Sequence, residues 1–134
     1  METMTEGKDF NFEVVHSPSF SLLTVTLNAG QKIKAETGAM VYMDPSVTLT
    51  TSSKGGLLGG LKRSMSKESF FINEFATTTG GKVGFAPAFP GDIYHLVVET
   101  GENWVISNGA YMASSISINT DSKFQGFKKG LFSG

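Results

Sequence analysis

The sequence predicts an all-β protein, built as a β-sandwich or barrel-like fold of duplicated antiparallel β units. Apolar and polar residues alternate in short runs along most of the chain, which is the pattern of strands with one face in a core. The 134 residues include 16 glycines and four prolines, a composition that suits tight turns between short strands. No segment has a convincing helical period, apart from one or two turns within residues 57–67. Together these observations favour a sandwich or a barrel.

The first half of the chain contains the clearest strand patterns. Residues 10–14 alternate apolar with polar side chains, and residues 20–27 place three apolar side chains on one face. A glycine turn separates them from residues 31–36, which alternate around Ile33 and Ala35. The same criteria predict strands at residues 40–43, 47–51, 70–75 and 82–86.

The second half begins after a proline-containing stretch, residues 87–92, which we interpret as a rigid connector. The residues after it again form short apolar runs separated by glycine turns. We therefore predict further strands at residues 93–99, 104–107, 110–113 and 116–119.

The second half also repeats the first. Residues 23–39 align without gaps on residues 94–110, with an offset of 71 positions at both glycine pairs (101 minus 30, and 109 minus 38). The turn glycines that define the repeat are Gly30, Gly38, Gly101 and Gly109. We expect each of them to occupy a turn that only a residue without a Cβ fits well. Trp104 aligns with Ile33, so it is predicted to be a core residue.

We interpret the chain as a frayed segment, residues 1–9, followed by a single β domain, residues 10–134. The two copies of the repeat are residues 23–87 and residues 94–134, and the second copy lacks counterparts of the strands that close the first. We therefore expect either that the chain is truncated at its C-terminal end or that a neighbouring chain covers the open edge.

The composition excludes several classes of function. With no cysteine, the chain has no disulfide, thiolate or cysteine-based metal site. A net charge of −1 gives no global field that would attract nucleic acid or an anionic membrane. The N-terminal residues have neither the basic start nor the apolar core of a secretory signal. No apolar run approaches the roughly 20 residues that a membrane-spanning helix requires.

A glycine- and leucine-rich stretch inside the first copy is the most distinctive candidate site. It consists of Gly55, Gly56, Leu57, Leu58, Gly59, Gly60, Leu61, Lys62 and Arg63. As a nucleotide phosphate loop it fails, because Leu61 precedes the lysine, Arg63 separates that lysine from Ser64, and a strand pattern follows instead of a long helix. We interpret it as a connection whose leucines pack within or between subunits. It could also be a membrane tip, with leucines in lipid and cations at the headgroups.

No catalytic residue, cofactor site or metal site is predicted. His16 and His95 are the two histidines, neither has an evident acid partner, and no cluster has metal-ligand spacing. No serine lies in a Gly-x-Ser-x-Gly elbow. Glu36, Glu74 and Asp92 could line a pocket with His95, which leaves an unrecognised enzyme or small-ligand binder as an open alternative.

Several spaced motifs also resemble a known family. They are Gly38-Ala-Met40, the Gly55–Arg63 stretch followed by Glu68-Ser-Phe-Phe-Ile-Asn73, Val83-Gly-Phe-Ala-Pro87 and Pro90-Gly-Asp-Ile93. From about Phe10 onward the chain resembles the altered-inheritance-of-mitochondria protein family. The resemblance implies a fold similar to that of the tryptophan RNA-binding attenuation protein, a β-sandwich of duplicated units that is often assembled into oligomers. It implies no reaction and no catalytic residues.

The function expected from the sequence is that of a non-catalytic structural or binding module, which acts through self-association and partner binding. We expect a homo-oligomer in the cytoplasm. The alternative is peripheral membrane association through residues 55–67, and an enzyme or small-ligand binder is the third possibility. The near-neutral charge argues against nucleic acid as a partner, and the sequence identifies no small-molecule ligand.

Overall fold

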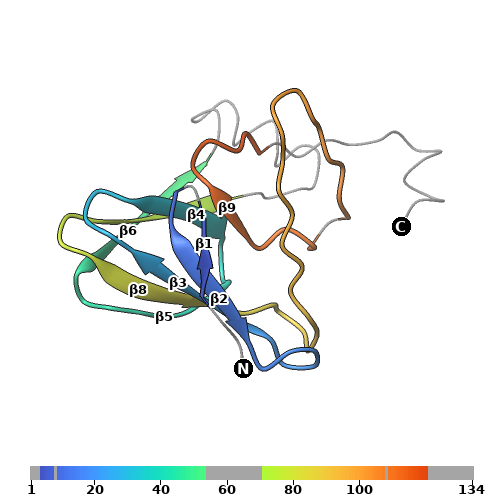
Figure 1. Ribbon diagram of the computed structural model, residues 1–134, viewed down its shortest axis with the longest axis horizontal. Helices are drawn as coiled ribbons and strands as arrows, with labels where there is room; N and C mark the ends of the chain where they lie inside the picture. Colours follow the sequence, from blue (N-terminus) through green and yellow to red (C-terminus); the bar gives the residue numbers. More distant parts are fainter. Residues whose placement is uncertain (1–3, 8, 54–70, 108, 121–134) are drawn as a thin grey trace.

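The computed structural model describes residues 4–7, 9–53, 71–107 and 109–120, and within these ranges all regular structure is strand (Figure 1). In chain order the strands are β1 (Thr5–Glu6), β2 (Asn11–Val15), β3 (Leu22–Leu27), β4 (Lys32–Glu36), β5 (Met40–Met43), β6 (Val47–Ser53), β7 (Phe71–Thr77), β8 (Gly81–Phe85) and β9 (Ala113–Ser115). The all-β prediction is confirmed. Likeness to the tryptophan RNA-binding attenuation protein stays a prediction.

The strands form two sheets whose hydrogen-bonded neighbours are antiparallel. One sheet has five strands in the order β1-β2-β3-β8-β5, and the other has four in the order β6-β7-β4-β9. Consecutive strands therefore often lie in different sheets: the chain passes from β3 in the first sheet to β4 in the second, and back again to β5.

The core lies between the facing sides of the two sheets. In β3 every second residue is buried, which matches the alternation of apolar residues in its sequence. Phe75 of β7 meets Phe85 of β8 edge to face, with ring centroids 5.2 Å apart. Ile33 and Ala35 of β4 are fully buried in the same cluster. Contacts between residues of both sheets therefore define a β-sandwich.

The second half differs from its prediction. Of the strands expected at residues 93–99, 104–107, 110–113 and 116–119, the described residues form only β9, which pairs with β4. Residues 93–107 and 109–112, which we call the arm, leave the sandwich as a long excursion (Figure 1). The physical reason is the absence of partner strands: β3 and β4 pair with β8 and β7, and the described part of the second copy contains no counterparts of those two strands.

The core assignment of Trp104 is also wrong. Its side chain is 54% exposed, whereas the aligned Ile33 is 0% exposed. Ile33 is buried because β7 lies beside β4 and the first sheet covers it. Trp104 has the same position in the repeat but no such cover among the described strands.

The turns of the two copies share their geometry. All four turn glycines have positive φ, of 85° at Gly30, 95° at Gly38, 87° at Gly101 and 85° at Gly109. In the first turn of each copy the Gln31 and Glu102 amides donate over 3.0 Å to carbonyls three residues earlier. Their side-chain oxygens accept from the backbone amides of residues 28 and 99, at 2.8 and 3.0 Å. The equivalence therefore extends from backbone conformation to side-chain contacts.

The contact between the two sheets can be tested on a single strand. Phe75→Ala is expected to lower the free energy of unfolding by about 3 to 5 kcal/mol, because the ring is fully buried and leaves a cavity. Phe71→Ala, in the same strand but 43% exposed, is the matched control and should cost about 1 kcal/mol or less. Urea unfolding measures both, and equal losses would contradict the assignment of the core.

Candidate functional site

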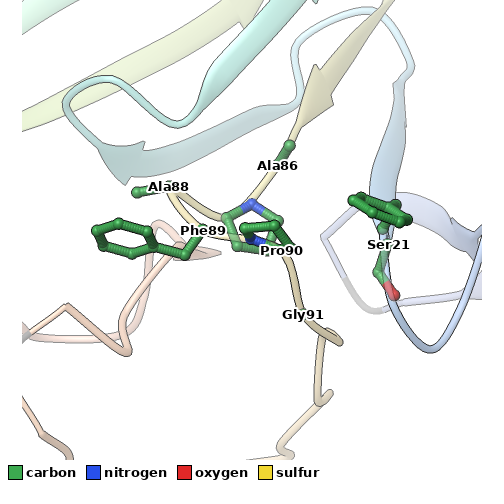
Figure 2. Close-up of a pocket in the computed structure, with 8 residues that line it drawn as sticks. Ser21, Ala86, Ala88, Phe89, Pro90 and Gly91 are labelled. Carbon is green, nitrogen blue, oxygen red and sulfur yellow. The ribbon is translucent and has the colours of Figure 1, made fainter.

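A short apolar connector leads into the arm and borders an open pocket. Residues 86–91 follow β8 and line a cavity of about 250 Å³ with residues that precede β3. The complete lining is Phe20, Ser21, Ala86, Pro87, Ala88, Phe89, Pro90 and Gly91. Figure 2 shows Phe89 and Ser21 on opposite sides of Pro90. Because Ser21 is the one hydrogen-bonding side chain in this lining, the pocket suits a small apolar group better than acid–base chemistry.

A polar contact fastens the start of the arm to the sandwich. Ser21 is buried, with 2% of its surface exposed, and its hydroxyl donates to Asp92 Oδ1 over 2.6 Å. The Ile93 amide donates to the same oxygen over 2.8 Å, and the Ser21 amide donates to the Gly91 carbonyl over 3.1 Å. The Ser21 hydrogen bond is the main reason why the pKa of Asp92 lies below its ordinary value of 3.8, followed by the Ile93 amide.

The far end of the arm is fastened by β9. Ala113 and Ser115 pair with Ala35 and Ile33 of β4, and the Glu36 amide donates to the Met112 carbonyl over 2.8 Å. Just before β9, the Tyr111 hydroxyl lies 2.9 Å from Ser114 Oγ, and burial raises the pKa of this tyrosine. Lys34 Nζ donates to the Ile118 carbonyl beyond β9. The arm is thus held at both ends.

Between these two ends the arm exposes large apolar side chains. Their exposed fractions range from 51% at Ile106 to 87% at Tyr94. The group consists of Tyr94, Val97, Trp104, Val105 and Ile106, and we call it the apolar arm surface. Its members are far more exposed than aligned residues of the first copy: Leu23, the counterpart of Tyr94, is 7% exposed. Large apolar side chains exposed on one segment make it a candidate association site.

The residues singled out from the sequence do not converge on one centre. The Gly55–Arg63 stretch lies outside the described residues. His95 packs edge to face on Phe12, with ring centroids 4.8 Å apart. Glu74 forms an ion pair with Lys32 at 3.4 Å, while Asp92 belongs to the arm contact. No group of three histidines, cysteines or acids in the described ranges could hold a metal ion.

Two features of the site were not predicted from the sequence. One is the contact between Ser21 and Asp92, although these residues are separated by the same 71 positions that define the repeat. Extending the alignment two residues toward the N-terminus would have paired them. The other is the exposure of apolar residues on β5, where Val41, Tyr42 and Met43 are 58%, 38% and 38% exposed. A run of apolar residues does not indicate whether its strand lies at the edge of a sheet.

Comparison with known proteins places the chain among relatives of unknown activity. The model of a family described as mitochondrial biogenesis AIM24 matches residues 12–134. An uncharacterised protein of Streptococcus pyogenes serotype M6 is 34% identical over 131 residues, which cover 92% of this chain and 52% of the relative. The chain therefore spans about half the length of this curated relative. No helix in the described ranges is long and apolar enough to cross a bilayer.

The contact at the start of the arm should make stability depend on pH. Because the folded pKa of Asp92 is lowered, its contribution is present above the unfolded pKa of about 4 and is lost as pH falls through the lower folded value. Asp92→Asn should therefore lower the denaturation midpoint at pH 6, and the difference from the unmodified chain should shrink as pH falls below the unfolded pKa of Asp92.

The urea midpoints of both proteins between pH 2 and 7 measure this effect. Ser21→Ala removes the hydroxyl donor and should also lower the urea midpoint at pH 6. Ser19→Ala, an exposed serine in the same turn, serves as the control and should leave the midpoint unchanged. A gap that stays constant with pH would contradict the role of the carboxylate.

Proposed function

This chain belongs to the mitochondrial biogenesis AIM24 family, and we propose that it is a non-catalytic module that works through self-association and partner binding across the apolar arm surface. The observation that carries the proposal is the exposure of Trp104, Val105 and Ile106, at 54%, 73% and 51%. Three consecutive large apolar residues exposed to this degree favour burial against a protein partner.

The structure of the arm supports this role in a second way. Because the Ser21–Asp92 contact and β9 hold its two ends, association would not have to order a free chain. Preorganisation of this kind lowers the entropic cost of binding. Aromatic residues such as Tyr94 and Trp104 are also the types that contribute most at protein interfaces.

The non-catalytic part of the proposal follows from the polar groups of the site. Ser21 uses its hydroxyl to hold Asp92, and the pocket beside it is lined by alanine, proline, phenylalanine and glycine. Among the described residues the Ser21 hydroxyl contacts Asp92 and Ser17, and the lowered pKa of the Asp92 carboxyl makes that carboxylate a weak general base. This arrangement supports a structural role for the serine over a role as an activated nucleophile.

Light scattering coupled to size-exclusion chromatography tests the proposal. The chain is expected to elute as an oligomer, and a Trp104→Ser/Ile106→Ser variant should weaken assembly by at least about tenfold, since two exposed apolar anchors are lost. Leu49→Ser is the matched control, because this leucine is also partly exposed (37%) but lies on β6. A monomer at every concentration, or an assembly that the arm variant leaves intact, would overturn the proposal.

The glycine- and leucine-rich stretch is tested in parallel. A Leu57→Ser/Leu58→Ser/Leu61→Ser variant examines the predicted role of this stretch, and flotation with anionic vesicles examines the membrane alternative. Flotation that this variant abolishes, from a chain that is otherwise monomeric, would favour a membrane surface over a protein partner.

A further inference from the structure

From the pairing of β9 with β4, we infer that a second copy of this chain is the partner of the arm, and that the open edge of its β5 adds to residues 104–107. This inference rests on the proposed function and specifies its partner and register. It would extend between molecules a strand contact that the chain already makes between its own two repeats.

The intramolecular contact supplies the geometry. Ala35 pairs with Ala113, and Lys34 pairs with Ser114, in an antiparallel register. By the repeat offset of 71, β4 corresponds to residues 103–107 and the start of β9 corresponds to the end of β5. Strand β9 of the second copy thus pairs with β4 of the first copy. The two strands occupy different positions in the repeat, because the counterpart of β9 in the first copy is β5.

Each of the two strands in the β4–β9 contact has an equivalent in the other copy of the repeat, and neither equivalent makes such a contact within the described chain. Residues 104–107 occupy the position of β4 in the second copy but pair with no strand among the described residues. Strand β5 occupies the position of β9 in the first copy and lies at the end of its sheet, with β8 as its single neighbour in the described structure. One copy of the chain therefore offers an acceptor segment and a donor edge for the same kind of contact.

The side chains at both surfaces fit such a contact. On the donor edge, Val41 is 58% exposed, whereas its counterpart Met112 is partly buried and packs against the core beside β4. On the acceptor segment, Ile106 is 51% exposed, whereas its counterpart Ala35 lies between β7 and β9 and is fully buried in the core. In each pair the residue that lacks neighbouring strands is the exposed one, and an exposed apolar edge strand is a template for pairing with another chain.

Carrying the observed register across by the offset gives specific residue pairs. Ala35 opposite Ala113 becomes Ile106 opposite Tyr42, and Lys34 opposite Ser114 becomes Val105 opposite Met43. Glu36 N–H donating to the Met112 carbonyl becomes Ser107 N–H donating to the Val41 carbonyl. The interface is heterologous, because one molecule contributes the arm and the other contributes β5.

Disulfide cross-linking tests this register directly, because the chain contains no cysteine of its own. Tyr42→Cys and Ile106→Cys chains carrying different tags are mixed and oxidised, and the disulfide between the two tags is measured. Directly opposite strand residues have Cβ atoms about 4.5–5.5 Å apart, close to disulfide geometry. Mixed disulfide should form at least about fivefold faster than in the matched mixture of Tyr42→Cys with Val105→Cys, which places the thiols on opposite faces.

A second pair of cysteine variants keeps the test valid if the Tyr42→Cys chain does not fold. Tyr42 lies over Gly84, so its replacement could disturb the first sheet, whereas Met43→Cys with Val105→Cys probes the next pair in register. A monomer in light scattering would refute both the proposed function and this inference. An oligomer in which neither pair cross-links faster than its control would leave self-association standing and overturn the β5 partner.

Discussion

The structure depends on the burial of one sheet against the other, centred where Phe75 of β7 meets Phe85 of β8. Both rings are fully buried, and Val25 of β3, Ile33 of β4 and Val83 of β8 belong to the same core cluster. Removing this apolar area from water is the main favourable term in folding such a domain. It requires two sheets, because each sheet is apolar on one face and covers the other.

The arm shows what the same pattern becomes without a second layer. Its residues align with those of β3 and β4 in the repeat, and its turns at Gly101 and Gly109 have the same left-handed glycines. Within the described chain, however, no strands correspond to β7 and β8 beside it. The backbone conformation of a turn is a local property, so the turns of the first copy recur in the second. A strand needs a neighbouring strand to pair with, so the strands equivalent to β3 and β4 do not form.

The sequence therefore predicts local features well and partner-dependent features poorly. Alternation placed the strands of the first half within a few residues of their observed bounds, since the apolar residues there do reach a core. The strand predicted from the apolar run at residues 93–99 did not form, and the burial predicted for Trp104 from its alignment with Ile33 failed for the same reason. Burial depends on which strands lie opposite, and neither composition nor period contains that information.

Residues 20–21 meet residues 91–92 through a parallel bridge from Phe20 to Gly91 and a hydrogen bond from Ser21 to Asp92. Both contacts join positions 71 apart, so each residue touches its own equivalent in the other copy. The duplication is therefore visible in space at this junction, although the rest of the second copy within the described ranges does not repeat the strands of the first. The junction consequently anchors the arm to the sandwich through equivalent positions of the two copies.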